Sequence, residues 1–388
     1  MKSNLSTICD YRKGKVDVAT LTHLSYISTE NMLPNKGGIT SAASLPTISQ
    51  TQEYRKGDVL VSNIRPYFKK IWKAKTDGGC SNDVLVFAAK DGTDPDFLYY
   101  VLADDSFFEY SMATSKGTKM PRGDKTSIMR YQVPAIDIST QRRIASILRS
   151  LDDKIELNTA INNNLLQQAI ALYEHLLQEA EWPTATILDI AEKVAMGPFG
   201  SNIKVSTFVP EGVPIISGNH LRGYFLEEPE FNYITEEHAE RLKNSIVYPH
   251  DLIFTHAGNI GQVAMIPDGC KYDRYVLSQR QFYLRCDATK VVPEFLLMFF
   301  HSASGQHELL SYANQTGVPS IAQPASNLKK IPFKCPPMQE QLKWQEQVHP
   351  LLGRYLNNRL ENEKLSALRD ALLPKLMSGE LDVSNIQL

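Results

Sequence analysis

The 388-residue sequence predicts an α/β fold of two tandem α/β domains, each followed by a long helix, with the two helices packing as an antiparallel coiled coil. Two observations lead to this prediction. Segments of the second half repeat the first half, and each half ends in about forty residues with an apolar heptad pattern. Two long copies do not suit a stacked solenoid. The repeat therefore predicts one fold used twice, with two similar sites.

The repeat keeps an offset of 198 residues through several segments. Residues 94–98 return as residues 292–296, and residues 118–121 return as residues 316–319. Val133 and Pro134 match Ile331 and Pro332, and Gln141 matches Gln339. We therefore expect a first domain over residues 1–138, a helix over 139–182, a second domain over 183–337, a second helix over 338–380 and a tail over 381–388.

The first long helix is expected to begin at Ser139 or Thr140, either of which can cap it. Pro350 should kink or restart the second helix, and Pro374 should disturb its last turn. Adding 200 to the residue numbers of the first apolar seam gives the second seam, so the two are expected to pair. The predicted seam residues are Leu148, Leu151, Ile155, Asn158, Asn162, Leu165, Leu172, Leu351, Tyr355, Asn358, Asn362, Leu365 and Leu372.

Two asparagines recur at the same place in both seams. A local two-fold axis between antiparallel helices would bring Asn158 to Asn362 and Asn162 to Asn358. Seam asparagines lower stability but fix register, which a spacer must hold. At 1.5 Å per residue, each helix would extend roughly 60 Å, longer than a single domain needs. The alternative is a solvated polar stripe.

Composition favours a cytoplasmic protein. The five cysteines form no CxxC pair and are odd in number, which is typical of reduced thiols. The longest apolar run, near residues 295–300, is far shorter than a membrane span. No membrane contact and no export are expected.

The net charge of −2 hides local basic clusters. Residues 54–75 carry seven Lys and Arg against Asp58 alone, and residues 116–130 carry five against Asp124 alone. Nucleic-acid binding needs such clustering, because phosphates are neutralised by grouped cations. A solvated charged edge is the alternative for either run by itself.

The second half contains amide-rich and glycine-rich turns between apolar strands, including residues 196–204, 212–220, 256–261, 277–281 and 315–321. Together with residues 336–341, which lead into the second helix, these strings resemble the DNA specificity subunit of type I restriction-modification systems. In the first half, residues 56–61, 117–121 and 140–144 carry the same frame. The resemblance covers nearly the whole chain.

The resemblance implies two target recognition domains, each reading one half of a bipartite double-stranded DNA target, with the helices setting the spacing. It implies a non-catalytic subunit that docks two methyltransferase subunits, which restriction subunits with translocase and nuclease activity then join. This chain would bind no cofactor; S-adenosylmethionine, ATP and Mg are expected on the partner subunits.

Side chains near the loops are the expected DNA contacts, because Lys and Arg bind phosphates while Arg, Asn and Gln read base edges. In the first domain the candidates are Arg65, Tyr67, Lys69, Lys70, Lys116, Lys119, Arg122 and Lys125. In the second domain they are Ser201, Asn202, Lys204, Asn219, His220, Arg222, His256, Asn259, Gln279 and Arg280. Gln279 could equally tie loops together.

Three other interpretations remain open at the level of sequence. The first is a two-lobed scaffold joining two proteins, and the second is a specificity subunit of a modification-only or fused methyltransferase-nuclease system. The third is a hydrolase with His220 or His256 as base, although neither has the spacing of a metal ligand and no nucleophile motif accompanies them. The sequence also lacks a phosphate-binding loop and an amino-methyltransferase motif.

Overall fold

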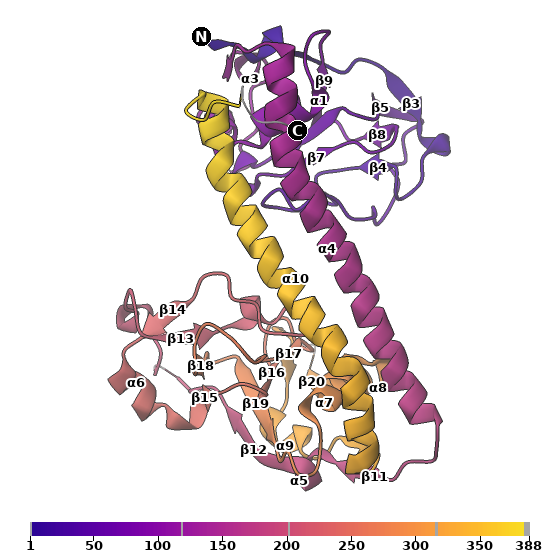
Figure 1. Cartoon of the computed structure of the whole chain (residues 1–388), viewed down its shortest axis with the longest axis vertical. Helices are drawn as coiled ribbons and strands as arrows, with labels where there is room; N and C mark the ends of the chain where they lie inside the picture. Colours follow the sequence, from indigo (N-terminus) through magenta and orange to yellow (C-terminus); the bar gives the residue numbers. More distant parts are fainter. Residues whose placement is uncertain (1, 118, 201, 315–316, 384–388) are drawn as a thin grey trace. The chain divides into compact units, whose positions relative to one another are not determined.

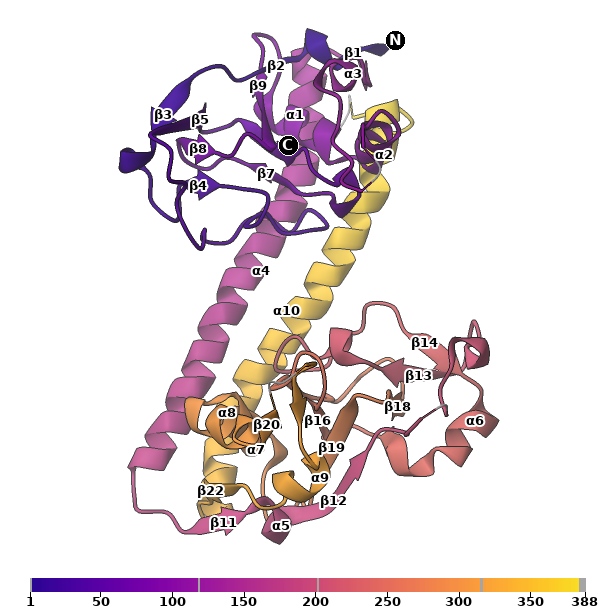
Figure 2. The same cartoon turned by 180° about the vertical axis from the view of Figure 1, so that it is seen from behind.

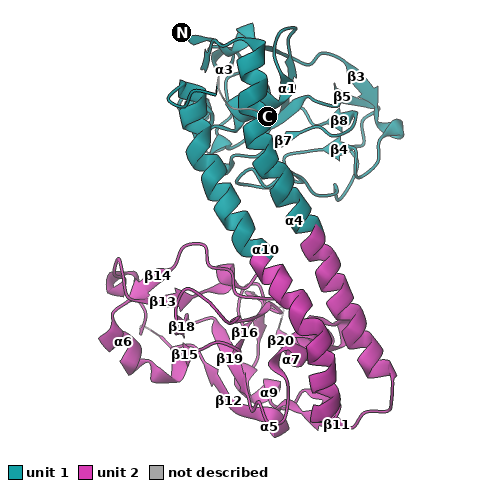
Figure 3. Cartoon of the chain, viewed as in Figure 1, with its two compact units in different colours: residues 1–160, 358–388 teal, residues 161–357 magenta. Residues whose placement is uncertain are grey.

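The computed structural model describes residues 2–117, 119–200, 202–314 and 317–383. The chain forms two compact units, shown in Figure 3. Unit 1 comprises Met1–Ala160 and Asn358–Leu388, and unit 2 comprises Ile161–Asn357. Each unit therefore contains part of both long helices, α4 (Ile138–Gln178) and α10 (Met338–Ser378).

Unit 1 contains two four-stranded sheets, ordered β2-β9-β6-β7 and β3-β5-β8-β4. Its α1 and α2 follow the first sheet, and η3 is a short 3-10 turn between β6 and β7. The elements are β1 (Lys2–Asn4), β2 (Cys9–Tyr11), β3 (Lys15–Asp17), β4 (Tyr26–Ile27), β5 (Gln50–Tyr54), β6 (Val59–Ser62), η3 (Pro66–Phe68), β7 (Ile71–Lys73), β8 (Gly78–Cys80), β9 (Val84–Ala89), α1 (Pro95–Ala103), α2 (Asp105–Ala113), α3 (Lys125–Ile128) and β10 (Gln132–Pro134).

Unit 2 also contains two four-stranded sheets, ordered β12-β19-β16-β17 and β14-β13-β18-β15. Its α7 and α8 correspond to α1 and α2. The elements are β11 (Thr184–Thr186), α5 (Ile187–Ile190), β12 (Ala191–Met196), β13 (Val213–Ile216), β14 (Asn232–Ile234), α6 (Glu236–Arg241), β15 (Ile246–Val247), β16 (Leu252–Thr255), β17 (Val263–Met265), β18 (Tyr275–Leu277), β19 (Gln281–Cys286), α7 (Pro293–His301), α8 (Ala303–Leu310), β20 (Ala313–Asn314), β21 (Ser320–Ile321), α9 (Pro324–Leu328) and β22 (Pro332–Lys334).

The first sheets of the two units have the same strand order, and their central strand pairs have the same register. In unit 1, β6 pairs with β9 from Val59 opposite Phe87 to Ser62 opposite Val84. In unit 2, β16 pairs with β19 from Leu252 opposite Leu284 to Thr255 opposite Gln281. The predicted double use of one α/β fold is therefore confirmed, and the residues on β6 and β9 have identifiable counterparts on β16 and β19.

A glutamine near the start of each long helix corrects the predicted alignment. The Gln141 Oε1 atom accepts a 3.0 Å hydrogen bond from the Asp94 N–H, and the Gln341 Oε1 atom accepts one of 3.0 Å from the Val292 N–H. The matching of Gln141 with Gln339 was wrong, because Gln339 is exposed and Gln341 makes the equivalent bonds. The offset is thus 198 through α1 and α7 and 200 in the long helices.

The start of α4 differs from the prediction. The helix begins at Ile138, and the Asp137 carboxylate accepts from the N–H groups of Ser139 at 2.9 Å and Thr140 at 3.0 Å. Asp137 is therefore the cap, since a carboxylate also interacts favourably with the positive end of the helix dipole. The Thr140 hydroxyl donates to the same carboxylate at 2.7 Å, and this bond together with the backbone bonds lowers the pKa of Asp137.

The prolines do not interrupt α10, which stays helical through both Pro350 and Pro374. The expected restart at Pro350 was wrong. A proline removes one backbone hydrogen bond, but Val348 and Leu352 on either side of Pro350 are buried in the unit 2 core. Leu373 and Leu376 are buried around Pro374 in the same way. Packing holds the helix where the local sequence disfavours it.

The helix segments run antiparallel within each unit (Figures 1 and 2). In unit 1 the Arg369 guanidinium pairs with Asp152 at 2.7 Å, and the Asn158 Nδ2 atom donates to Asn362 Oδ1 at 2.9 Å. In unit 2 the rings of Tyr173 and Trp344 lie 6.4 Å apart. As the residue numbers rise along α4, the residues opposite them in α10 have falling numbers. The segments are therefore antiparallel, as predicted.

The seam asparagines fall in different units. The predicted contact of Asn158 with Asn362 is confirmed, and Asn158 also donates to Glu361 at 2.7 Å. In unit 2 the Asn162 Nδ2 atom donates to the Tyr355 carbonyl at 3.1 Å. The contact of Asn162 with Asn358 would join the two units and stays a prediction. Of the predicted seam, Leu148, Asn158, Asn162 and Asn358 are buried, while Leu151, Ile155, Leu165, Leu172, Leu351, Tyr355, Asn362, Leu365 and Leu372 are partly buried.

Unit 2 contains a neutral histidine that makes its stability depend on pH. The His301 ring stacks on Tyr224 with centroids 3.8 Å apart, and its Nε2 atom lies 2.9 Å from the Val263 carbonyl. Burial lowers the pKa of His301 from 6.5 to about 4. Because the unfolded chain binds the proton more readily, stability is complete above pH 6.5 and is lost as pH falls toward 4.

We predict that unit 2 loses about 2 kcal/mol of unfolding free energy through His301 between pH 7 and pH 5. Denaturant unfolding at both pH values, compared with a His301→Gln variant, isolates this contribution. Glutamine retains a donor for Val263 and does not titrate in this range. His220, whose pKa burial also lowers, is present in both proteins and cancels in the comparison. An equal loss in wild type and variant would contradict the assignment.

Candidate nucleic-acid interface

Three loops of unit 1 meet beyond the end of β6, and they bring together several predicted contacts. The Asn63 N–H donates to the Asp83 carbonyl at 2.8 Å, and the Arg65 N–H donates to the Pro121 carbonyl at 2.9 Å. Ile64 forms an antiparallel bridge with Arg122. We call residues 63–65, 81–83, 116–117 and 119–123 the unit 1 loop cluster.

Unit 2 repeats this arrangement bond for bond. The His256 N–H donates to the Arg280 carbonyl at 2.9 Å, and the Gly258 N–H donates to the Pro319 carbonyl at 3.0 Å. Ala257 bridges Ser320, as Ile64 bridges Arg122. We call residues 256–258, 278–280 and 317–320 the unit 2 loop cluster. The same backbone frame therefore presents different side chains in the two units.

The unit 1 loop cluster is strongly basic. Lys116 and Arg122 have side chains 81% and 55% exposed, and Lys119 and the adjoining Lys125 are also exposed. Lys116 pairs with Asp124 at 2.7 Å, which holds the pKa of that carboxyl well below its usual range, and Arg122 pairs with Asp83 at 3.1 Å. Surface pairs of this kind are weak, so these cations remain available to phosphates.

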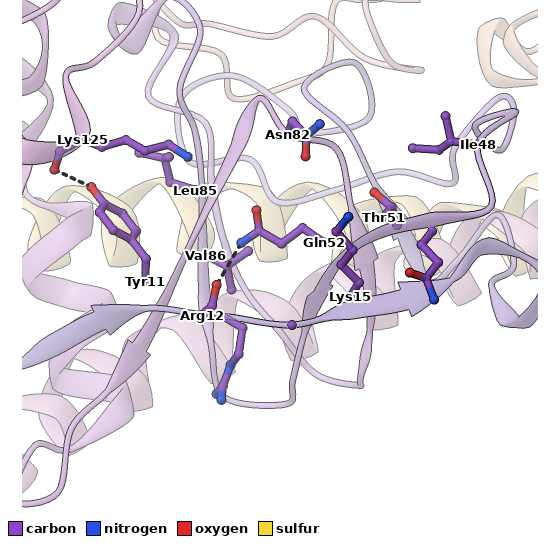
Figure 4. Close-up of a pocket in the computed structure, with 12 residues that line it drawn as sticks. Tyr11, Arg12, Lys15, Ile48, Thr51, Gln52, Asn82, Leu85, Val86 and Lys125 are labelled. Carbon is purple, nitrogen blue, oxygen red and sulfur yellow. Dashed lines mark hydrogen bonds between the residues drawn. The ribbon is translucent and has the colours of Figure 1, made fainter.

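A pocket of about 460 Å³ with both polar and apolar side chains in its lining meets this cluster at Asn82 and also includes the adjoining Lys125. Figure 4 shows the Tyr11 hydroxyl donating to the Lys125 carbonyl, at 2.9 Å, and the Gln52 amide donating to the Arg12 carbonyl, at 3.3 Å. Arg12, Gln52 and Asn82, which line this pocket, were not among the predicted DNA contacts. The available signal was the polar turn at residues 81–83 between two apolar strands.

Two predicted lysines of unit 1 lie outside the cluster. Lys69 pairs with Asp105 at 2.8 Å and is only 33% exposed, and the Lys70 ammonium donates to the Thr29 carbonyl at 2.6 Å. Burial lowers the pKa of Lys70. Both side chains are less exposed than those of Lys116 and Arg122, so we now expect them to contribute less to phosphate binding; their contact with DNA stays a prediction. Tyr67 is half exposed beside them.

The unit 2 candidates also divide. Gln279 and Arg280 are exposed in the loop cluster, and Gln279 additionally donates to the Gly200 carbonyl, so it does tie two loops together. His256 is partly buried, with its Nε2 atom 3.1 Å from the Gln279 carbonyl. Asn202, Lys204, Asn219, Arg222 and Asn259 are exposed, and Ser201 lies outside the described residues.

His220 is a structural residue rather than a DNA contact. Its ring is buried and stacked on Phe231 at 4.5 Å, with Nδ1 accepting from the Ser217 N–H at 2.9 Å and Nε2 lying 3.2 Å from the Glu230 carbonyl. Both ring nitrogens are occupied, and no general-base role suits them. Within the described ranges, no three His, Cys, Asp or Glu side chains gather as a metal site, and no helix is long and apolar enough to cross a membrane.

Comparison with known proteins agrees with this architecture. The family of type I restriction modification DNA specificity domains matches residues 2–167 and 179–369. The chain therefore belongs to this family.

Similar proteins are specificity subunits. The MjaIX type I restriction enzyme specificity subunit of Methanocaldococcus jannaschii is 24% identical, over 76% of this chain and 71% of its own. The HindI type I specificity subunit of Haemophilus influenzae is 23% identical, over 95% of this chain and 96% of its own. The crystal structure of the type I restriction-modification S subunit from M. genitalium has a TM-score of 0.56 at 15% identity, covering 97% and 96% of the two chains. That structure shares the fold.

Proposed function

We propose that this chain is the specificity subunit of a type I restriction-modification enzyme and that each unit reads one half of a bipartite duplex DNA target. The observation that carries the proposal is the pair of loop clusters. Equivalent backbone bonds, Arg65 to Pro121 and Gly258 to Pro319, present different side chains on one repeated frame. Two similar frames with different polar side chains suit two half-sites of different sequence.

The long helices would set the distance between the half-sites and dock the partner subunits. Both α4 and α10 have 41 residues, and their unit 1 segments expose Leu157, Leu360 and Leu368 to solvent. Exposed leucines on a helix pair favour burial against another protein. We propose two methyltransferase subunits as these partners, with restriction subunits joining them.

We further propose that the chain itself catalyses nothing and binds no cofactor, and that S-adenosylmethionine, ATP and Mg belong to the partner subunits. Support comes from the family, which is one of DNA specificity domains. The same loops would equally serve a modification-only system or a fused methyltransferase-nuclease. The basic unit 1 cluster favours all of these over a protein scaffold, because clustered exposed cations suit phosphates.

Lengthening the helix pair should lengthen the spacer of the recognised DNA. Inserting one heptad near Asn162 and one near Asn358 preserves the seam and adds about 10 Å, since an α-helix rises 1.5 Å per residue. We expect a spacer longer by about three base pairs, at 3.4 Å each. Mapping methylated positions in cells that express the variant with its methyltransferase measures the spacer.

A seven-residue Gly/Ser insertion at residue 180, just beyond the end of α4, is the matched control. It adds the same length of chain and leaves the helix pair unchanged, so the spacer should stay as in the wild type. An unchanged spacer after the double heptad insertion, or a changed one after the loop insertion, would show that the helices do not set the distance.

A further inference from the structure

Arg65 lies in a backbone conformation that disfavours its side chain. Its φ is 50° and its ψ is 66°, in the left-handed region, where it caps the 3-10 turn η3. L-residues other than Asn and Asp adopt this region rarely, because the Cβ atom comes too close to the following carbonyl oxygen. Strain of this kind persists only where something else over-determines it.

The counterpart of Arg65 in unit 2 is a glycine. Gly258 has a φ of 91°, and its N–H donates to Pro319 as the Arg65 N–H donates to Pro121. The fold thus requires a positive φ at this point of both loop clusters, and glycine meets that requirement without strain. The backbone conformation therefore does not explain why unit 1 has an arginine at this position.

The reason for the arginine is not an interaction inside the protein. Across the described residues the Arg65 side chain makes no hydrogen bond or ion pair, and its Nε atom is buried without a partner. Lys69, four residues later in the same turn, also has a φ of 50°, but its ammonium is held by Asp105. Of these two strained cations, only Lys69 has an internal partner.

Unit 2 places a guanidinium at the same point from a different loop. The position of a Cβ atom on Gly258 lies 3.6 Å from the Arg280 Nη1 atom. The unit 1 counterpart of Arg280 is Asp83, by the register of β9 and β19. At these two matched positions each cluster therefore holds one arginine. The residue at the other position is glycine in unit 2 and an acid in unit 1.

We propose that Arg65 and Arg280 are the base-reading residues of their units and that each recognises a guanine in one half-site; this rests on the function proposed above. An arginine fork donates two hydrogen bonds to the O6 and N7 atoms of guanine in the major groove. A side chain that reads a base must be attached to a rigid backbone position, and the strained turn provides such a position for Arg65. Lys116, Lys119 and Arg122, which lie in the same loop cluster, would contact phosphates.

The test compares Arg65→Gly, Arg65→Lys and Arg280→Ala with a matched control, Lys69→Gly. Each variant is co-expressed with its methyltransferase, methylated positions are mapped, and the melting temperature of the purified protein is measured. Arg65→Gly should leave the melting temperature unchanged or raised, because it relieves backbone strain. It should also reduce discrimination at one guanine of one half-site by roughly tenfold or more.

Arg65→Lys keeps the charge but not the planar fork, so it should lose the same guanine preference. Arg280→Ala should reduce the preference for guanine at one position of the other half-site. Lys69→Gly should leave the recognised sequence unchanged. A lower melting temperature for Arg65→Gly would show a structural role. Three outcomes would contradict base reading by these arginines. They are an unchanged guanine preference in Arg65→Lys, methylation that weakens equally at all sequences in the variants, and a wild-type half-site that contains no G·C pair. A wild-type complex that methylates no split motif would overturn the proposed function itself.

Discussion

Replacing Asp251 with alanine is expected to lower the unfolding free energy of unit 2 by about 3 kcal/mol. The Asp251 side chain is 2% exposed and accepts two hydrogen bonds from the Arg285 guanidinium, at 2.8 and 2.6 Å. It also accepts from the Tyr248 N–H at 2.9 Å. Removing the carboxylate leaves all three donors without their acceptor, and unpaired buried donors are costly.

The same aspartate position is used in unit 1, where Asp58 accepts from Arg12 at 2.8 and 2.6 Å. There the arginine follows β2, whereas Arg285 lies on β19. Both units thus keep the buried acid at the start of the equivalent strands β6 and β16 and supply its partner from different strands. We infer that the acid fixes the turn that leads into the strand.

Thermal or denaturant unfolding measures the Asp251→Ala effect, with Asp268→Ala as the control in the same unit. Asp268 is 70% exposed and pairs with His250 at 3.0 Å. A surface pair contributes about 0–1 kcal/mol, so the control should unfold nearly as the wild type does. Equal destabilisation by the two substitutions would contradict the importance of the buried pair.

Neutralising Lys119 and Lys125 together should weaken DNA binding and reduce its salt dependence. Both side chains are exposed, and within the described part of the chain neither forms an ion pair with a carboxylate. Each phosphate contact contributes about 0.9 to the slope of log K against log salt concentration. The double variant Lys119→Gln, Lys125→Gln should therefore lower the slope by about two, for matched and mismatched duplexes alike.

Lys69→Gln with Lys70→Gln is the matched control, since it removes the same charge from the same unit. Lys69 is paired with Asp105 and Lys70 with the Thr29 carbonyl, so both are expected to contribute less to phosphate binding. We expect this control to change the salt slope little. Titrating the assembled complex onto a duplex at several salt concentrations measures both variants. A larger effect from the control pair would reverse the assignment.

The duplicated fold and the helix pairing could be predicted because they depend on repeating apolar patterns. The heptad seam placed Asn158 opposite Asn362 correctly, since register follows from which residues are buried. The helix cap at Asp137 and the continuity of α10 through Pro350 could not be predicted from the helix preferences of the local residues. Neighbouring acceptors and core packing decide such details, and they outweigh intrinsic propensity.

The loops were located from their composition, but the role of each side chain was not. Lys69 and Lys116 look alike in sequence and each pairs with an aspartate, yet the Lys69 side chain is 33% exposed and the Lys116 side chain is 81% exposed. His220 stands in a polar loop and is nevertheless buried. The equivalence of Arg65 and Gly258 is invisible in sequence, because it depends on a hydrogen bond to a proline carbonyl in a distant loop.

The most direct test of the account is to co-express the chain with its methyltransferase and map methylated bases across the host genome by single-molecule sequencing. Two reading units joined by a helix pair predict a split motif, with two specified halves separated by an unspecified spacer of constant length. Methylation at a single contiguous motif, or a stable complex that methylates nothing, would contradict the central claim.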